Sequence, residues 1–312
     1  MTGTSTIYVV GAGSIGMPLA ALLSARGASV VAVRTSREGI ASTIVEPTVE
    51  LADWQAITAR VEMVSLSELE NMDGGIVALT AKATANAAIA QKLKRLSPEL
   101  PLVLMQNGVH VERAFLDAGF TNLYRCVLYA TGQPASDGEG YRFREVAKSP
   151  IGAVNGDPDT ARALAAQLTT PGFRFRYEAD IERQVWKKAI VNAAFNSICP
   201  LANIDNGVFH RDPTLAAMAE TILAEAGEVA ERLGITFAPG ELMEQLLLIS
   251  RRADGQLIST LQDLNHGKET EIEFLNLEIA RVGTSLTPPV DTPVTRTLGE
   301  LIAARSRQTR GA

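Results

Sequence analysis

The sequence predicts an α/β part joined to an all-α part, with a Rossmann-type doubly wound sheet over residues 1–179 and a helical domain over residues 180–312. Three observations predict this fold class. A glycine motif follows a β-rich run near the N-terminus, and strand-like and helix-like segments then alternate as far as residue 177. From residue 181 onward, almost every segment has helical periodicity. A chain of 312 residues is also long enough for two domains.

The composition excludes several classes of function. The net charge is −6 and no basic run offers a footprint for phosphates, so we expect no nucleic-acid partner. No apolar run reaches the length of a bilayer helix and no signal-peptide pattern is present, so we expect no membrane partner and a cytoplasmic location. Two distant cysteines, Cys126 and Cys199, favour buried thiols in a reducing compartment, with a single disulfide as the alternative. The three histidines lack metal-binding spacing, so we expect no metal.

The N-terminal segment has the pattern of a dinucleotide-binding unit. A β-rich run at residues 7–10 leads into Gly11-Ala12-Gly13-Ser14-Ile15-Gly16, then into an apolar helix at 18–23 and a second strand at 28–33. The first glycine permits a tight turn, the second lets a pyrophosphate approach the backbone, and the third allows close contact between helix and strand. The alternative is a structural glycine-rich turn in a domain without a ligand.

The end of the second strand indicates which dinucleotide is bound. A site for NAD places an acid there to accept a hydrogen bond from the ribose 2′-hydroxyl. This chain has Arg34-Thr35-Ser36-Arg37 instead, and two guanidinium groups suit a 2′-phosphate. The sequence therefore favours NADPH, the alternative being two surface arginines on a loop.

The alternation continues through two more strand–helix pairs, with strands at 75–80 and 101–105 and helices at 83–96 and 111–118. Lys82 and Asn107 follow the two strands, where a parallel sheet presents its carboxyl ends to a ligand, so both are expected to face the cofactor. For Asn107-Gly108 the alternative is an ordinary turn dipeptide.

The rest of the chain divides into a short β-rich stretch and a long helical one. Runs at 123–130, 141–146 and 151–154 suggest antiparallel strands appended to the sheet, followed by a helix at 159–168 and a strand at 173–177. Helical segments are then expected near 181–203, 213–234, 239–253, 255–265, 268–282 and 293–306.

One helix, over residues 184–196, carries an unusual polar stripe. Lys188, Asn192 and Asn196 lie at i, i+4 and i+8, which places them on one face, and two amides occupy the positions where acids commonly pair with a lysine. One interpretation is a solvated polar face. The other is a lysine positioned by amides against a neutral, oxygen-rich ligand.

A set of motifs in a fixed order resembles the ketopantoate reductase (2-dehydropantoate 2-reductase) family over nearly the whole chain. The motifs are Gly11-Ala12-Gly13-Ser14-Ile15-Gly16, Thr80-Ala81-Lys82, Gln106-Asn107-Gly108, Trp186-Lys187-Lys188 with Asn192 and Asn196, Ser259-Thr260-Leu261-Gln262-Asp263, and Thr270-Glu271-Ile272-Glu273. The lysine helix and the last two motifs are the specific ones, since the glycine motif is shared with many other nucleotide-binding proteins.

The resemblance implies roles for single residues. Lys188 matches the catalytic lysine, and Asn192, Asn196 and Asn206 match asparagines that contact the substrate. Ser259 matches the serine that holds the substrate carboxylate, although alone it would be an ordinary helix serine. The remaining matches are Glu271 as a site glutamate near catalysis and cofactor, Asn107 near both cofactor and substrate, and Arg34 with Lys82 at the NADPH phosphates. For Glu271 the alternative is a cap on a helix starting near Lys268.

The activity implied by the resemblance is the NADPH-dependent reduction of ketopantoate to (R)-pantoate, with lysine as general acid and without a metal. Two departures, Leu277 after Asn276 and a Pro-rich loop over 285–289, leave the identity of the 2-oxo acid open. The alternatives are a reductase of another branched or aromatic 2-oxo acid, giving a D-2-hydroxy acid, and a non-catalytic NADPH sensor. The sequence leaves the oligomeric state open, with a homodimer as one option.

Overall fold

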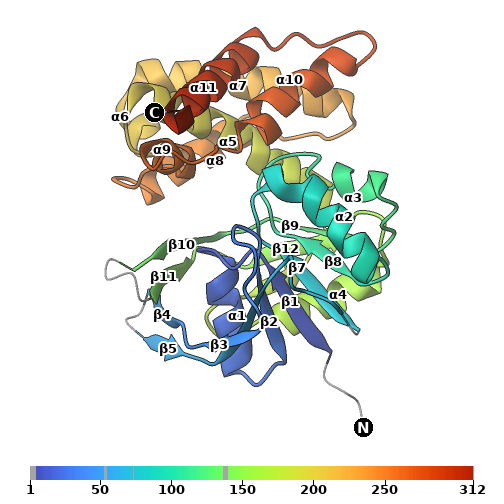
Figure 1. Cartoon of the computed structure of the whole chain (residues 1–312). Helices are drawn as coiled ribbons and strands as arrows, with labels where there is room; N and C mark the ends of the chain where they lie inside the picture. The colour runs from blue at the N-terminus through green and yellow to red at the C-terminus, as the bar shows by residue number, and fades with distance from the viewer. Residues whose placement is uncertain (1–4, 53–54, 73, 136–139, 312) are drawn as a thin grey trace. The chain divides into compact units, whose positions relative to one another are not determined.

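The protein forms two compact units in its computed structural model, which describes residues 5–52, 55–72, 74–135 and 140–311 (Figure 1). The first unit comprises Met1–Gln106 and Val111–Ile181, and the second comprises Asn107–His110 and Glu182–Ala312. The expected α/β part followed by a helical part is confirmed. The functions assigned to residues 1–179 and 180–312 stay predictions.

The first unit is built on a nine-stranded sheet in the order β13-β12-β9-β8-β7-β1-β2-β6-β3. Its central strands, from β9 to β6, are parallel, whereas β12 pairs antiparallel with β9 and β3 antiparallel with β6. The strands are β1 (Thr6–Val10), β2 (Val30–Arg34), β3 (Thr43–Val45), β6 (Val61–Ser65), β7 (Gly75–Leu79), β8 (Leu102–Leu104), β9 (Leu123–Cys126), β12 (Ser149–Ala153) and β13 (Phe175–Tyr177).

Helices cover both faces of this sheet, as a doubly wound fold requires. Apolar side chains of α1 (Gly16–Ala25) and α4 (Pro158–Leu168) share one core with the sheet, and those of α2 (Asn86–Leu96) and α3 (Arg113–Asp117) share the other. The parallel order reverses at β1, which lies between β2 and β7. Ligands bind at such a switch point, beyond the carboxyl ends of the strands.

A second, four-stranded sheet was not expected. It has the order β10-β11-β4-β5 and consists of β4 (Thr48–Leu51), β5 (Ala56–Thr58), β10 (Ala130–Pro134) and β11 (Gly140–Glu145). The prediction that residues 141–146 join the main sheet is therefore wrong, because β11 pairs parallel with β4 and only Phe143 of this strand is buried. Of the polar, Gly-rich segment 132–138 between β10 and β11, residues 132–134 belong to β10 and residues 136–138 fall outside the described residues.

The second unit is helical, and its longest helix, α5, coincides with the expected lysine helix. The helices are α5 (Ile181–Ala202), α6 (Val208–Arg211), α7 (Pro213–Arg232), α8 (Glu241–Arg252), α9 (Ser259–Asn265), the 3₁₀ turn η2 (Ile272–Phe274), α10 (Asn276–Ser285) and α11 (Pro293–Gly311). Two predicted starts are wrong, since α9 begins at 259 rather than 255 and α10 at 276 rather than 268. Gly255 and Gly267 have φ values of 73° and 62°, so the chain turns in the left-handed region before each helix.

Buried and half-buried carboxylates fix helix ends in this unit. Asp212 accepts hydrogen bonds from the backbone N–H groups of Thr214 and Leu215 at the start of α7. Glu225 on α7 accepts from Val294 N at 3.0 Å and Thr295 N at 2.8 Å, so it occupies the N-terminus of α11. Each contact satisfies backbone donors that a helix leaves unpaired at its start. Within the described ranges, no helix has both the length and the apolar composition needed to cross a bilayer.

The glycine loop yields a stability prediction. A Cβ at Gly16 would overlap the Gly11 carbonyl oxygen and Thr80 Oγ1, whereas a Cβ at Gly13 would have no atom within 4 Å. Gly16→Ala should therefore lower the free energy of unfolding by about 1–3 kcal/mol through overpacking, and Gly13→Ala should leave it nearly unchanged. Urea denaturation of the two variants without nucleotide checks this, and equal midpoints would contradict the packing of the loop.

Candidate active site

The glycine loop is held where three strands of the sheet end. Gly11 N donates to Val33 O at 2.8 Å, which joins the loop to β2. Thr80, directly after β7, donates from its backbone N–H to Val10 O at 2.8 Å and from its hydroxyl to Gly11 O at 2.8 Å. These bonds fix the backbone of the loop before any ligand binds.

The start of α1 has the features of an anion site. Its N-cap residue, Ile15, makes no side-chain cap hydrogen bond, and the first turn holds no acid. Gly13 is exposed with open space where a Cβ would stand, while Ala12 and Gly16 are buried. Backbone N–H groups and the helix dipole are thus available to a pyrophosphate, which can approach closely at Gly13.

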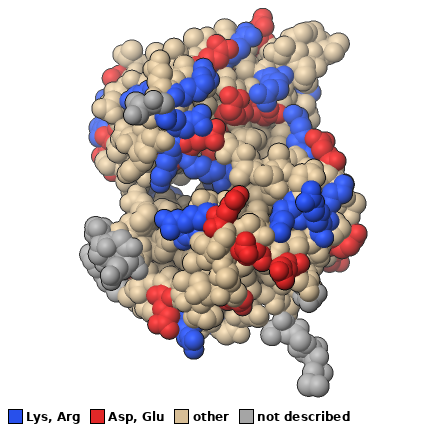
Figure 2. Space-filling view, viewed as in Figure 1, with Lys and Arg blue, Asp and Glu red and all other residues tan. Residues whose placement is uncertain are grey.

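Arg34 lies at the end of β2, as predicted, and is half-buried. Its Nε atom is buried and lacks a hydrogen-bond partner in the described part of the chain. A buried guanidinium donor without a partner is costly, and an anionic oxygen would satisfy it. On the face shown in Figure 2, Lys and Arg side chains are interspersed with Asp and Glu side chains.

Lys82 and Asn107 both follow carboxyl ends of parallel strands, β7 and β8, and both are half-buried. Next to Asn107, Gln106 forms a reciprocal amide pair with Asn86, with distances of 3.0 and 2.7 Å, and donates to Ala81 O at 2.6 Å. The ends of β7 and β8 are therefore joined by a buried polar network. Asn107 itself belongs to the second unit, with Gly108, Val109 and His110.

The two neighbouring lysines of α5 differ in their contacts. Lys187 Nζ lies 2.9 Å from Glu241 Oε1 of α8, and Arg183, one turn earlier, donates to both oxygens of the same carboxylate at 2.9 and 2.7 Å. Lys188, one residue later and about 100° around the helix, is half-buried on the face that carries Asn192 and Asn196. The contacts of Lys187 therefore agree with the expected helix register, in which Lys187 and Lys188 lie on different faces of α5.

Hydrogen bonds join the asparagine face of α5 to α9. Asn196 is buried, its amide nitrogen donates to Asn192 O at 2.8 Å, and its Oδ1 accepts from Thr260 Oγ1 at 2.6 Å. One amide N–H of Asn196 is left for a substrate, and its predicted contact would use that group. Thr260 follows Ser259, which is exposed at the first position of α9. The Thr260–Asn196 bond therefore ties the helix that carries Ser259 to the lysine helix.

Ion pairs fix the turn that carries Asn206. Arg211 donates to both oxygens of Asp205, at 2.8 and 2.7 Å, and to Asp254 at 2.6 Å. These hydrogen bonds from Arg211, against some burial, hold the pKa of Asp205 below its ordinary value. Asn206 itself is buried, and its Oδ1 atom has no hydrogen-bond partner among the described residues. A fixed, unsatisfied amide oxygen suits a ligand hydroxyl.

Glu271 is half-buried and immediately precedes η2. Its side chain makes no cap hydrogen bond, and no helix starts near Lys268, so the interpretation of Glu271 as a helix cap is wrong. Its roles in catalysis and cofactor binding stay predictions.

Two other ionisable groups have shifted pKa values. Burial raises the pKa of the Cys199 thiol to about 12, so the group is neutral at physiological pH. Burial also raises the pKa of Glu241, but hydrogen bonds from Ala238 N, Lys187 and Arg183 outweigh it and leave the value at about 2. Among the described residues, no group of three or more His, Cys, Asp or Glu side chains could hold a metal ion.

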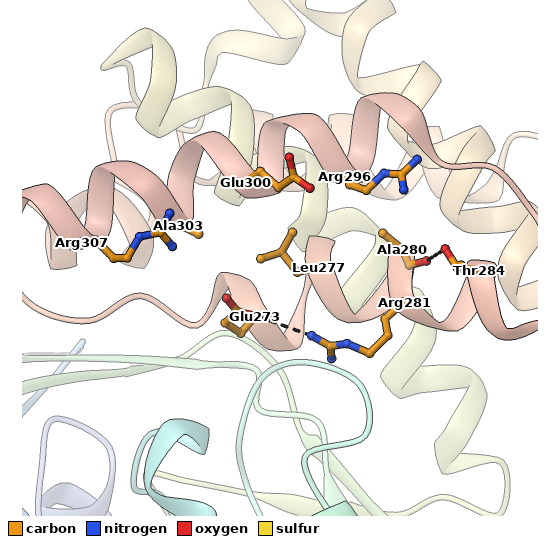
Figure 3. Close-up of a pocket in the computed structure, with 9 residues that line it drawn as sticks. All are labelled: Glu273, Leu277, Ala280, Arg281, Thr284, Arg296, Glu300, Ala303 and Arg307. Carbon is orange, nitrogen blue, oxygen red and sulfur yellow. Dashed lines mark hydrogen bonds and ion pairs between the residues drawn. The ribbon is translucent and has the colours of Figure 1, made fainter.

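A groove of about 360 Å³ lies between α10 and α11 (Figure 3). It is lined by Glu273, Leu277, Ala280, Arg281, Thr284, Arg296, Glu300, Ala303 and Arg307. A second groove, of about 770 Å³, is lined by residues of α7, α8 and the segment between them. Neither contains a predicted site residue, although Leu277, which departs from the family pattern, lines the first.

Family models match both parts of the chain: "Ketopantoate reductase PanE/ApbA" over residues 7–146 and "Ketopantoate reductase PanE/ApbA C terminal" over residues 180–306. The chain belongs to the ketopantoate reductase family. The predicted family is thereby confirmed, as is the expectation of an oxidoreductase acting on a CH–OH group.

Relatives within the family are distant but cover most of the chain. The 2-dehydropantoate 2-reductase of Archaeoglobus fulgidus is 28% identical over 301 residues, or 95% of this chain and 96% of the relative. That of Pyrobaculum aerophilum is 28% identical over 235 residues, 75% of this chain and 77% of the relative.

Solved structures share the fold. The 2-dehydropantoate 2-reductase of Geobacter metallireducens has a TM-score of 0.83 at 21% identity, covering 96% of this chain and 99% of the other. A D-mandelate dehydrogenase with NADH and anilino(oxo)acetate has a TM-score of 0.82 at 22% identity, covering 97% and 99%.

The residues that hold the predicted site residues in place were not identified from the sequence. Thr260, Asp205, Arg211 and Glu241 each act through a partner on a separate segment, so sequence spacing carried no signal for them. Asp205 and Thr260 adjoin predicted site residues, which is the one hint that the sequence offered.

The Glu241 cluster should make stability depend on pH. The folded pKa of about 2 lies below the ordinary 4.5, so the stabilising contribution is present above about pH 4.5 and is lost as the pH falls towards 2. Thermal unfolding of the wild type and of Glu241→Gln should therefore differ most near neutral pH and converge in acid. A difference in melting temperature that stays constant across this range would contradict the cluster.

Proposed function

We propose that this protein reduces ketopantoate to (R)-pantoate with NADPH, using Lys188 as the general acid. The observation that carries the proposal is the contrast between two adjacent lysines in a chain of the ketopantoate reductase family. Lys187 is paired with Glu241, whereas Lys188 lies on the face of Asn192 and Asn196. An ammonium beside amides can stabilise the negative charge that develops on a substrate oxygen.

The cofactor assignment is supported by the first unit. The backbone from Gly11 to Gly16 and the start of α1 would hold the pyrophosphate, with open space at Gly13. Arg34, with a buried Nε atom that lacks a partner, would hold the 2′-phosphate, and Lys82 would add a second cation. On this basis residues 1–179 bind NADPH and residues 180–312 supply the catalytic and substrate-binding groups.

The chain's own residues would bind the substrate and move one proton. Ser259 would donate to the substrate carboxylate, while Asn192, Asn196 and Asn206 would orient its hydroxyl group. When bound, the reduced nicotinamide supplies a hydride to C2. The Lys188 ammonium would hydrogen-bond the ketone oxygen, give it a proton as the charge develops, and then regain a proton from solvent. Glu271 and Asn107 would hold the lysine and the reacting groups in position.

Two finer points belong to the same proposal. Two buried cysteines that form no disulfide suit the reducing environment of the cytoplasm. A homodimer is proposed because a ketopantoate reductase of Staphylococcus aureus with the same fold is described as dimeric.

The second candidate substrate class is an aromatic 2-oxo acid, favoured by the shared fold with D-mandelate dehydrogenase and by the departure at Leu277.

Substrate and cofactor choice can be tested together by following NADPH and NADH oxidation with ketopantoate, benzoylformate and several branched 2-oxo acids. We expect the highest kcat/KM with ketopantoate and NADPH. A preference for benzoylformate would assign the protein to the second candidate class, and no oxidation with any member would refute a reductase of this kind.

The variant Arg34→Ala tests why the protein would prefer NADPH to NADH. The variant should raise the KM for NADPH and leave that for NADH nearly unchanged, because only NADPH carries the 2′-phosphate. Equal catalytic efficiency of the wild type with the two cofactors would show that Arg34 is not a 2′-phosphate ligand.

Lys188→Ala should lower kcat by roughly 10²–10⁴-fold, the usual contribution of a general acid. The wild type should lose turnover at high pH, where a neutral amine cannot donate, and this limb should vanish in the variant. Lys187→Ala is the matched control: it loses the pair with Glu241 but should keep turnover. Circular dichroism and NADPH titration establish that both variants fold. A large loss of turnover in Lys187→Ala, with turnover kept in Lys188→Ala, would show that Lys187 and not Lys188 is the general acid.

A further inference from the structure

The four residues Asn107–His110 come from the middle of the first unit's sequence but belong to the second unit. Val109 N donates to Phe274 O, just before α10, at 2.9 Å. Gly108 has φ 100°, and a Cβ there would overlap the Phe274 carbonyl oxygen, so the backbones approach as closely as glycine allows. Asn107-Gly108 is thus a docking segment, which the alternative of an ordinary turn dipeptide does not explain.

His110 ends the docked segment and contacts two helices. Its Nδ1 donates to Glu278 Oε1 of α10 at 2.8 Å. Its ring meets Trp186 of α5 edge-on, with centroids 6.2 Å apart and planes at 82°. Trp186 is buried and lies two residues before Lys188 on the same helix. A single imidazole therefore connects the docked segment to α10 and to the lysine helix.

The carboxylate that receives this hydrogen bond is itself fixed. Glu278 is 3% exposed, and its other oxygen accepts from Arg281 Nη1. Arg281 also reaches back along α10 to Glu273, at 3.6 Å (Figure 3). Because a buried carboxylate needs hydrogen-bond partners, Glu278 has one orientation available and aims one oxygen at His110.

The backbone of His110 indicates that these contacts are strong. Its φ is 55°, in the left-handed region that residues with a Cβ seldom adopt. Such a conformation persists where the surroundings enforce it, and it often occurs at functional sites. On the other side of Asn107, Gln106 is fixed by the amide pair with Asn86. Asn107 therefore lies between two anchored residues.

We propose that His110 is a positioning residue, which holds Asn107 in place relative to the lysine helix through Glu278 and Trp186. The inference rests on the proposed function, because Asn107 is taken there as a residue at cofactor and substrate. His110 touches neither in this proposal; it acts through the placement of the docked segment.

The test compares two substitutions at this one position. His110→Gly removes the imidazole and tolerates the left-handed backbone, so the change isolates the side-chain contacts. His110→Asn also tolerates that backbone, and its amide can donate to Glu278 in place of Nδ1. We expect His110→Gly to lower kcat/KM for the 2-oxo acid by roughly tenfold to a hundredfold, the scale of an ångström-sized misplacement. NADPH affinity should fall less than kcat/KM, because most of the proposed NADPH contacts lie in the first unit, and His110→Asn should recover most of the loss.

Hydrogen exchange of the Val109 amide gives a readout that does not need activity. This N–H is bonded to Phe274 O, so it should exchange faster in His110→Gly and near the wild-type rate in His110→Asn. Unchanged Val109 exchange in His110→Gly would overturn the proposal. So would wild-type kinetics in His110→Gly, or equal losses in the two variants. If the wild type reduced no 2-oxo acid, the proposed function would fail on that result alone, while the exchange data would still decide whether His110 anchors the segment.

Discussion

The ion pair between Lys187 and Glu241 holds one of the two neighbouring lysines of α5 against α8. At 2.9 Å, with Arg183 on the same carboxylate, it fixes the rotation of α5 about its axis. Because the next residue lies about 100° further round, Lys188 is directed to the asparagine face. Lys187, which is paired with Glu241, and Lys188, the predicted catalytic lysine, are neighbours in sequence but lie on different faces of the helix.

The same division between holding and acting recurs around the other predicted site residues. Thr260 holds Asn196, the Asp205–Arg211 pair holds the turn at Asn206, and Gln106 and His110 hold the two sides of Asn107. Most of these contacts join segments distant in sequence, whereas Asp205 and Arg211 lie six residues apart. Side chains held in this way have few alternative positions, which is what orienting a substrate requires.

The sequence was informative where a local pattern has a local consequence. The largely buried apolar runs of β1 and β2, the glycine motif and the apolar stripe of α5 follow from the local sequence, and the structure has these elements where they were expected. Strands β3 to β5 were not predicted, because they are largely exposed and have no apolar run, as Thr43–Val45 shows. The start of α9 was misplaced because Gly255 turns the chain at the beginning of the predicted segment. The start of α10 was misplaced because the separate 3₁₀ turn η2 occupies residues 272–274 of the predicted segment. Contacts such as His110 with Glu278 span 168 residues, and one sequence offers no pattern for them.

Buried polar atoms without partners give a physical argument for where ligands bind. Among the described residues these atoms are Arg34 Nε, Arg125 Nε, Asn206 Oδ1, Asn276 Oδ1 and Thr295 Oγ1. Arg34 and Asn206 stand out, because both are predicted binding residues. The backbone of Asn206 is fixed, since its N–H donates to Gln256 O and its carbonyl oxygen accepts from the Ser250 hydroxyl. On the proposed function, a 2′-phosphate oxygen would satisfy the first and a substrate hydroxyl the second, so part of the binding energy would come from completing bonds that folding left open.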